Sequence, residues 1–341
     1  MSASCPAWLA ALQPILDSVS IESPTCFMLA GTRIDAMARP APSPDDDFFD
    51  PDPLMRTLHR RLYAAFHAGA AAAEDPPKAR ETFIMRLSEA NAGRDRLEQG
   101  WTVIETLASG VVVAQKGYRT RRWTPGEFLS ESAPARPVRK TPIKVQRRRE
   151  ARALQESFYF AFGSATEDEY ERVRSVRYYL NIAADAAVDV VGLLTSAFGR
   201  RAIPFACKCA NSPGGFERRD PCVLYIGARH AQLAHFVLEA LQPLLAPLLR
   251  PAVPILTQTL APGLAFAEEP AGADSFGGHR MRAVAHGLIA AHRNGRCDEA
   301  GRRAALLESF SAFGIDLEAP HLVAGTGDPF GLRRLVFADA G

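Results

Sequence analysis

The sequence predicts an α+β fold, in which an N-terminal helical region precedes a mixed or antiparallel sheet packed with several long helices. Apolar residues near the N-terminus recur every three or four positions, which is the period of an amphipathic helix. The middle of the chain carries short β-type runs, and long helical patterns follow in the second half. Hairpins beside long helices favour an α+β fold over a regular βαβ winding.

Bulk composition indicates a globular protein with one large domain or two ordinary ones. The chain has 341 residues, of which 47% are hydrophobic, and a formal net charge of +2. No basic segment precedes the first apolar residues, and no apolar run approaches the roughly 18 residues of a membrane span. Six cysteines without a CxxC pair indicate reduced thiols. We therefore expect a cytoplasmic protein with no membrane partner.

The N-terminal region is predicted to be helical. Apolar residues from Trp8 to Val19 form one helical face, and a second helix is expected from Pro53 to about Ala73. The acidic, proline-rich residues at about 40–53 are predicted to form a linker or exposed loop. We predict an N-terminal helical region over 1–78 and an α+β catalytic domain over 79–341.

The middle of the chain is predicted to form strands. The runs WTVIETL and VVVAQ, between Trp101 and Trp123, are joined at Ala108-Ser109-Gly110, where glycine permits the positive φ of a tight hairpin. The strand-like runs TPIKVQR and SFYFAF follow. Residues 116–152 carry twelve Lys or Arg against three Glu. This basic stretch would attract an acidic peptide, a phosphorylated chain or nucleic acid, or form a solvated loop face; nucleic acid ranks last because base-stacking aromatics are few.

The second half alternates between strands and helices. Strands are expected at 177–182, 203–209 and 222–226. Helices are expected at about 185–198, 231–249, 280–293 and 298–313. Gly314 suits the residue that follows the end of the last helix, where a left-handed conformation is common.

A single lysine interrupts the apolar strand IPFACKCA. Alternation places Lys208 on the face opposite Phe205, Cys207 and Cys209. A lysine surrounded by apolar residues loses its proton more readily and can act as a base, although an edge lysine with its amine in water has the same pattern. Cys207, Cys209 and Cys222 could form a thiolate metal site, but they lack zinc-ligand spacing, so inert buried thiols are favoured.

Two further segments carry anion-binding residues. In FERRDPCVLYI, Arg219 could bind a phosphate with Asp220 orienting its guanidinium group, and Tyr225 shares the strand parity of Arg219. In SFGGHR, a glycine-containing turn enters a helix, where exposed backbone N–H groups and Arg280 could hold an anion and His279 could donate a proton. Solvated turn charges and an ordinary helix start are the alternatives.

Several ordered blocks resemble the Hop effector A family of type III secreted proteins. They are LSEANAGRDRLEQGW (87–101), VRYYLNI (176–182), IPFACKC (203–209), FERRDPCVLY (216–225), PILTQTLAPGLAFAEEP (254–270), SFGGHR (275–280) and FGIDLEAPHL (313–322). The chain departs from the family pattern at Gln258, where lysine is usual after the threonine, and at 324–330, where the terminal motif is degraded.

The resemblance implies two kinds of function. Members delivered into plants act in virulence and recognition. Relatives encoded with aminoglycoside-phosphotransferase-like kinases eliminate phosphate from phosphoserine or phosphothreonine during maturation of ribosomally made thioamitide and class V lanthipeptide precursors. Because no segment resembles a translocation signal followed by a chaperone-binding region, we favour the second branch. It implies a phosphorylated precursor peptide and a kinase as partners.

Elimination requires a base at Cα, positive charge around the phosphate and a proton donor for the bridging oxygen. We predict Lys208 as the base, Arg219 and Arg280 with the backbone of 277–279 as the phosphate site, and His279 as the donor. The supporting residues are predicted to be Arg177, Tyr178, Asn181, Asp220, Tyr225, Glu268, Ser275, Gly277 and Gly278. No metal or organic cofactor is expected, because phosphate is a good leaving group. The competing hypothesis is a non-catalytic effector or scaffold that binds a phosphorylated or acidic partner.

Overall fold

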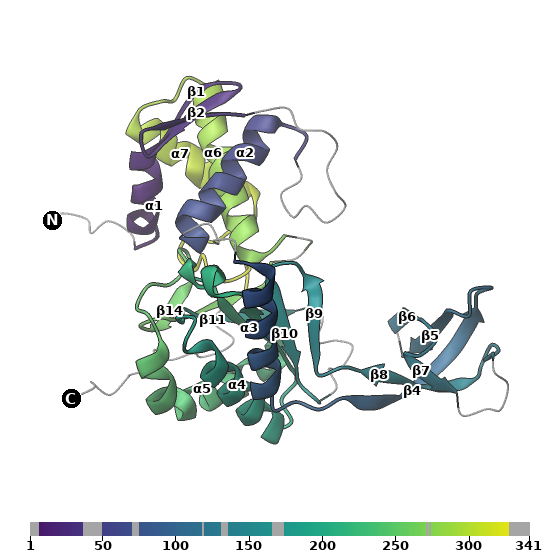
Figure 1. Ribbon diagram of the computed structural model, residues 1–341. Coiled ribbons are helices and arrows are strands. Elements are labelled where there is room, and N and C mark those ends of the chain that lie inside the picture. The colour runs from purple at the N-terminus through teal and green to yellow at the C-terminus, as the bar shows by residue number, and fades with distance from the viewer. Residues whose placement is uncertain are drawn as a thin grey trace.

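The computed structural model describes residues 7–36, 50–69, 75–117, 119–130, 136–165, 174–270, 272 and 274–326. Within these residues the fold is α+β, as predicted, with seven α-helices and three antiparallel sheets (Figure 1). The sheets belong to three parts of the molecule: a central body, a lobe above it in Figure 1, and an arm that projects from one side.

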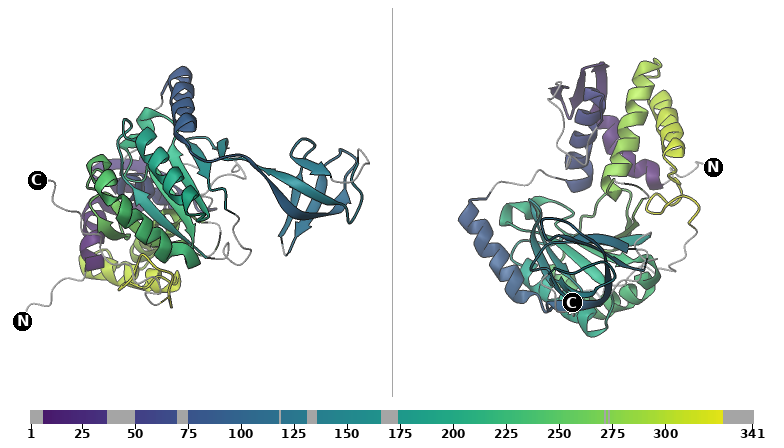
Figure 2. Two further views of the ribbon diagram at one scale, coloured as in Figure 1. Left: turned by 90° about the horizontal axis from the view of Figure 1, so that it is seen from below. Right: turned by 90° about the vertical axis from the view of Figure 1, so that its right-hand side faces the viewer.

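The body contains a seven-stranded sheet. Its strands, in spatial order, are β14 (Gln258–Ala261), β15 (Leu264–Glu268), β11 (Ser175–Leu180), β13 (Cys222–Gly227), β12 (Phe205–Ala210), β10 (Phe158–Phe162) and β9 (Glu150–Gln155). One face is covered by α3 (Pro77–Ala90), α4 (Ala187–Arg200) and α5 (Ala231–Leu245) (Figure 2). The strands at 177–182, 203–209 and 222–226 are confirmed to within two residues at each end.

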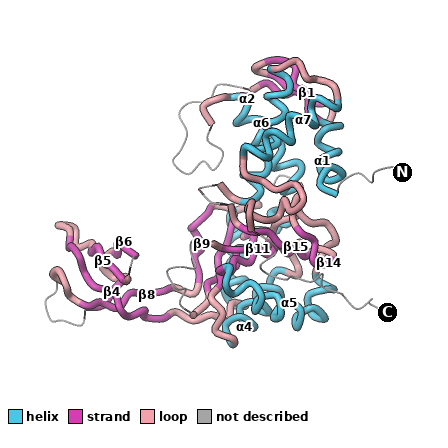
Figure 3. The backbone as a smooth tube through the Cα atoms, turned by 180° about the vertical axis from the view of Figure 1, so that it is seen from behind, coloured by secondary structure: helices cyan, strands magenta, loops and turns pink. Residues whose placement is uncertain are grey.

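The opposite face of the sheet packs against the lobe. The lobe consists of α1 (Ala7–Ser18), β1 (Val19–Ser23), β2 (Cys26–Leu29), β3 (Thr32–Asp35), α2 (Pro53–Leu62), a π-helical segment (Tyr63–Ala68), α6 (Phe276–Arg293) and α7 (Glu299–Ala312). One apolar core joins the first and last of these elements, since Leu16 and Leu58 pack with Val284 and Phe310. The lobe therefore combines segments from both ends of the described chain (Figure 3).

Successive residues of β11 show how the sheet serves both layers. Tyr178 belongs to the core beneath α4 and α5, whereas its neighbour Tyr179 belongs to the core shared with the lobe. Side chains alternate between the two faces of a strand, so a single strand supplies both cores. The lobe-facing residue Tyr179 consequently lies where the two layers meet.

The arm has a small core of its own. It consists of β4 (Arg96–Thr106), β5 (Val112–Lys116), β6 (Arg119–Trp123), β7 (Phe128–Ser130) and β8 (Pro142–Arg147). Trp101, Val112 and Val145 are buried inside it. The predicted hairpin is confirmed, and Gly110 has the expected positive φ of 84°. Most of the basic stretch 116–152 lies on this arm, where Lys116 pairs with Glu98 at 3.0 Å.

Several boundaries differ from the sequence-based predictions. The second helix becomes π-helical at Tyr63 and ends at Gly69, which adopts a left-handed conformation (φ 85°); residues 70–74 lie outside the described part. The helix expected at Arg280 begins at Phe276 instead, because the Ser275 hydroxyl caps it by accepting from Gly278 N. The sheet β1–β3 was not predicted. Most of the acidic segment at 40–53 lies outside the described residues, and the division at residue 78 stays a prediction.

Other elements follow the predictions closely. The helix expected at 185–198 is α4, and the last helix ends before Gly314, whose φ is 62°. The helix expected at 231–249 consists of α5 and a short 3-10 turn, Ala246–Leu248. No helix among the described residues combines the length and apolar character needed to cross a membrane.

Candidate active site

A cavity of about 1040 Å³ lies between the lobe-facing side of the sheet and the lobe. Its walls come from the π-helical segment, α3, the β9–β10 hairpin, and strands β11, β12 and β13. Five cationic side chains line it, namely Arg80, Arg152, Arg177, Lys208 and Arg218, against two carboxylates, Glu156 and Asp220. Cationic side chains thus outnumber carboxylates on the cavity wall, while Glu269 and Glu150 pair with Arg177 and Arg152 from outside it. The cavity therefore favours an anionic ligand.

Lys208 projects into this cavity from β12. Its neighbours Cys207 and Cys209 are fully buried in the opposite core, as the alternation along the strand predicts. The Lys208 Nζ lies 3.8 Å from the centroid of the Phe158 ring, within range of a cation–π interaction. Lys208 thus lies on the cavity wall with its amine against an aromatic ring.

Arg218 and Asp220 form a buried ion pair at the cavity wall. Arg218 donates to both carboxylate oxygens, at 2.8 Å from Nε and 2.9 Å from Nη2. The Tyr63 hydroxyl also donates to Asp220, at 3.1 Å. Burial by itself would raise the pKa of Asp220, but the charge and hydrogen bonds of Arg218, with smaller contributions from His67 and Lys208, hold this pKa well below its ordinary value. Asp220 is therefore an anion that orients Arg218.

Arg219, which we predicted as the phosphate-binding arginine, lies outside the cavity. Its backbone N–H donates to Ala68 O at 2.6 Å, and its Nη1 donates to Phe66 O at 3.1 Å. Its side chain packs beside Gly69, where a Cβ would lie 2.7 Å from Nε. Arg219 therefore donates hydrogen bonds to carbonyl groups at the end of the π-helical segment. Its neighbour Arg218 lines the cavity instead.

Arg177 and Tyr225 are partners across β11 and β13. The Arg177 guanidinium lies 4.9 Å from the centroid of the Tyr225 ring and donates to both carboxylate oxygens of Glu269. Burial opposes its charge, but the nearby Tyr225, Tyr179 and Glu269 raise the pKa of Arg177 well above its ordinary value. Arg177 is thus a fixed cation, held in place by a ring and a carboxylate.

Two buried polar groups on the cavity wall lack a hydrogen-bond partner among the described residues. They are His67 Nδ1 and the Tyr179 hydroxyl. The His67 ring lies between Tyr63 and Tyr179, with centroid distances of 5.1 Å and 5.8 Å. Burial is the main cause that lowers the pKa of His67 to about 4, so the imidazole is neutral near pH 7. Unsatisfied buried donors are costly and are typical of a site that a ligand completes.

The predicted anion cradle at the start of α6 lies away from the cavity. Arg280 is buried and donates to Pro320 O and Leu322 O, both at 2.8 Å. Its Nη1 also donates to His279 Nδ1 at 2.7 Å, and the His279 ring contacts Phe313. His279 and Arg280 therefore fix the segment that follows α7 to the lobe, and neither lines the cavity.

The first turn of α6 is occupied by contacts within the protein. Ser275 lines the cavity, but its hydroxyl caps the helix at Gly278 N. The carbonyl of Gly278 accepts a hydrogen bond from His59 Nε2 at 2.7 Å, and Gly277 packs against the His67 ring. This turn positions His67 and contributes one side chain, Ser275, to the cavity.

Three more predicted residues have structural contacts outside the cavity. The Tyr178 hydroxyl donates to Ala231 O at 2.9 Å on the opposite face of the sheet. Asn181 accepts two hydrogen bonds from Arg250, at 2.7 Å and 3.0 Å. Glu268 pairs with Arg174 at 2.7 Å and accepts from Val323 N at 3.0 Å. The structure thus brings together Lys208, Asp220, Tyr225, Arg177 and Ser275, but not the other predicted residues.

Several cavity residues were missed by the sequence analysis. Tyr63 and His67 come from the N-terminal region, Arg80 from α3, and Arg152 from β9. Of the missed residues, only Arg218 could have been identified from the sequence, because it lies next to Arg219 and Asp220 in a segment already selected as an anion-binding candidate. The other residues lie in segments that the sequence predicted to be packing elements or a basic loop. Only the tertiary fold brings them together at one cavity.

The model of the HopA1 effector protein family matches residues 150–322, which are 173 of the 341 residues. The chain belongs to the HopA1 effector protein family. The matched part of this HopA1-family protein contains Arg177, Lys208, Arg218 and Asp220, whereas His67 precedes it.

Two solved structures of effector proteins resemble this HopA1-family protein. The effector from Pseudomonas syringae pv. tomato strain DC3000 has 17% identity and a TM-score of 0.43, over 77% of this chain and 88% of that chain. The effector from Pseudomonas syringae pv. syringae strain 61 has 13% identity and a TM-score of 0.43, over 80% and 96%. No curated protein matches the chain.

The close contact between Gly277 and His67 gives a stability prediction. A Cβ on Gly277 would lie 2.4 Å from the His67 ring, so Gly277→Ala must displace the ring or α6. We expect Gly277→Ala to lower the free energy of unfolding by about 1–3 kcal/mol, as overpacking typically does. Urea denaturation measures this change. The matched control is Gly199→Ala in α4, which has open space and should change stability little or raise it by about 0.5–1 kcal/mol; equal effects in both variants would contradict the prediction.

Three histidines predict a loss of stability in mild acid. Burial is the main cause that lowers the pKa values of His59, His67 and His279 to about 4, from 6.5. Below pH 6.5 these histidines bind protons in the unfolded chain but stay neutral in the folded protein. Their contribution to the free energy of unfolding is therefore complete above pH 6.5 and falls as the pH approaches 4. We expect about 2 kcal/mol per histidine to be lost by about pH 5, measured by urea unfolding.

A variant comparison isolates this effect. His59→Gln should remove about a third of the pH dependence between about pH 7.5 and about pH 5, because one of the three histidines with a lowered pKa is gone. His292→Gln, near the end of α6 and only partly buried, is the matched control and should retain the full dependence. A His59→Gln variant with an unchanged pH profile would contradict the assignment.

Proposed function

We propose that this HopA1-family protein is a lyase that eliminates phosphate from phosphoserine or phosphothreonine of a precursor peptide. The products are dehydroalanine or dehydrobutyrine and inorganic phosphate, in the maturation of a thioamitide or class V lanthipeptide type of precursor, with a separate kinase supplying the phosphorylated residue. One observation supports it most directly. Lys208 lies in the same cavity as Arg177 and Arg218, two guanidinium groups fixed by carboxylates.

Lys208 serves as the base. Its unprotonated amine takes the Cα proton, the released electron pair forms the Cα–Cβ double bond, and the Cβ–O bond breaks so that phosphate leaves with that bond's electrons. The cationic side chains of the cavity attract the anionic substrate.

Arg218 and Arg177 hold the phosphate. Each guanidinium is oriented by its carboxylate partner, Asp220 or Glu269. Fixed donors stabilise the charge that builds on the leaving phosphate without the cost of reorganising a mobile side chain. Arg80 and Arg152 add positive charge on the α3 and β9 walls.

His67 and Tyr179 donate hydrogen bonds to the leaving oxygen in this proposal. Both residues line the cavity and have a buried polar atom with no hydrogen-bond partner among the described residues, whereas His279, our sequence-based candidate, lies outside the cavity. Although His67 is neutral without a ligand, a bound phosphate dianion would favour its protonated form and make it a better donor. The substrate thus supplies the negative charge that prepares the proton donor.

The proposal is tested with a synthetic phosphothreonine peptide and the purified protein. We expect mass spectrometry to detect a peptide lighter by one molecule of phosphoric acid, and a thiol to add to the new double bond. The unphosphorylated peptide is the control and should remain unchanged. Stoichiometric binding without loss of phosphate would instead support the non-catalytic scaffold or effector, which the same cationic cavity could serve.

A further inference from the structure

Strand β9 forms one edge of the seven-stranded sheet. Among the described strands it pairs only with β10, and residues 152–155 are exposed. Phe162 N–H donates to Arg149 O at 2.7 Å, so the alternation of an antiparallel ladder turns the N–H and C=O of Glu150 away from β10. Leu154, an apolar residue, is 61% exposed. An edge of this kind is a template for another strand.

The edge runs directly into the cationic cavity. Residues Arg152–Gln155 line the 1040 Å³ cavity, while Arg148–Leu154 line a second one of about 670 Å³ along the start of the strand. Arg152, Ala153 and Leu154 belong to both, so open space follows β9 from one cavity to the other. A chain lying along this edge would have a residue at the cavity mouth.

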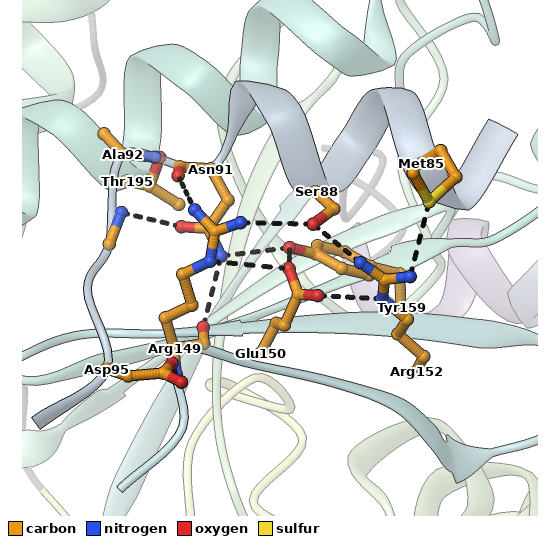
Figure 4. A network of polar contacts seen from close by, with 11 residues as sticks. Met85, Ser88, Asn91, Ala92, Asp95, Arg149, Glu150, Arg152, Tyr159 and Thr195 are labelled. Atoms are coloured by element: carbon orange, nitrogen blue, oxygen red, sulfur yellow. Dashed lines mark hydrogen bonds and ion pairs between the residues drawn. The ribbon is translucent and has the colours of Figure 1, made fainter. Parts of the chain in front are cut away.

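A network of polar contacts holds β9 in position (Figure 4). The Glu150 carboxylate accepts hydrogen bonds from Arg152 Nε and from the Tyr159 hydroxyl, both at 2.8 Å. Arg152 also donates to Ser88 of α3 at 2.9 Å. Because β9 is tied to α3 and β10 before a ligand arrives, less ordering is needed on binding.

We infer that the substrate peptide binds as an added strand on the free edge of β9 and presents its phosphorylated residue to the cavity. Main-chain hydrogen bonds supply affinity that is independent of sequence, and the phosphate supplies the specific contact through the cavity's cationic groups. The occupant is an extended segment of a phosphorylated peptide. The inference rests on the proposed function for the identity of this peptide, but it concerns binding alone.

An N-methyl scan tests the added strand. The probe is a fluorescein-labelled peptide of alternating alanine and serine around one phosphothreonine, in which a CH2 group replaces the bridging oxygen so that phosphate cannot leave. Each variant carries one N-methyl group and is titrated against the wild-type protein. We expect alternate positions to lose at least about tenfold in affinity and those between to change little, because only every second N–H faces the partner strand.

Hydrogen exchange provides a second measurement on the protein. The amide of Glu150, which the register turns away from β10, should gain protection when the phosphonate peptide binds. Strand β14, the opposite edge of the same sheet, is the control and should not change. A probe that does not bind, an affinity without two-residue periodicity, or unchanged exchange at β9 would each overturn the inference.

These outcomes are separate from those of the proposed function. Periodic binding together with no phosphate elimination would retain the docking strand and reject the lyase. Elimination from the phosphothreonine peptide without periodic N-methyl effects would retain the lyase and reject the docking strand.

Discussion

Replacing Lys208 with methionine should lower the rate of phosphate elimination by about a thousand-fold, the scale expected when a general base is lost. Methionine keeps the length and apolar stem of the side chain, so its contact with the Phe158 ring can persist while the amine is absent. The measurement is the rate of phosphate release from the phosphothreonine peptide under single-turnover conditions.

The matched control is Lys78→Met on α3, which removes an exposed lysine that does not line the cavity. It should retain the wild-type rate. Lys208→Met should still bind the phosphonate peptide, with an affinity reduced by no more than about tenfold, because Arg177 and Arg218 remain. A Lys208→Met rate within about twofold of wild type would show that another group removes the proton.

The second large effect is on stability and concerns the Arg218–Asp220 pair. Arg218→Met leaves a carboxylate that is 7% exposed without its guanidinium partner. Removing one partner of a buried ion pair typically costs about 3–5 kcal/mol, because the other charge stays desolvated. We expect the urea midpoint to fall accordingly, with an unchanged slope of free energy against urea concentration.

The double variant Arg218→Met, Asp220→Asn separates the buried charge from the lost packing. We expect it to recover at least about half of the stability, because asparagine removes the unpaired charge. Arg200→Met, at the exposed end of α4, is the control and should change stability by no more than about 0.5 kcal/mol. If the double variant were less stable than Arg218→Met, the unpaired charge would not be the cause.

The same pair predicts behaviour in strong acid. The pKa of Asp220 in the folded protein is held below its ordinary value of 3.8. Its contribution to stability is therefore present above the ordinary pKa and is lost as the pH falls towards the depressed one. Asp220→Asn should flatten this part of the pH profile, whereas the histidine effect at milder pH should remain.

Most of the secondary structure could be predicted from the sequence because it depends on local spacing. The alternation around Lys208 identified the strand face that carries the lysine, and Gly110 and Gly314 marked a hairpin and a helix end. The same local reasoning failed at the second helix, where the π-helical turn from Tyr63 depends on packing against α6 and the sheet.

The candidate site could be predicted only in part. Sequence spacing selected Lys208 and Asp220, which both line the cavity, but it could not distinguish Arg218 from Arg219 as the arginine at the cavity. The turn before β13 decided this, because Arg219 is held by Ala68 O and Phe66 O and Arg218 pairs with Asp220. The two adjacent arginines carry the same charge, and they differ in the direction in which the backbone points their side chains. The sequence does not give that direction.

The sequence by itself determined several of the strands and helices, the face of β12 that carries Lys208, and the family resemblance. The tertiary structure alone decided which distant groups meet. His67 from the lobe and Arg152 from the β9 edge line the cavity. His279 and Arg280 instead bond to each other, and Arg280 also binds the segment after α7. The reason is physical. Side-chain periodicity is set by neighbouring backbone angles, whereas contacts across the cavity depend on how a sheet and a lobe from both ends of the described chain pack together.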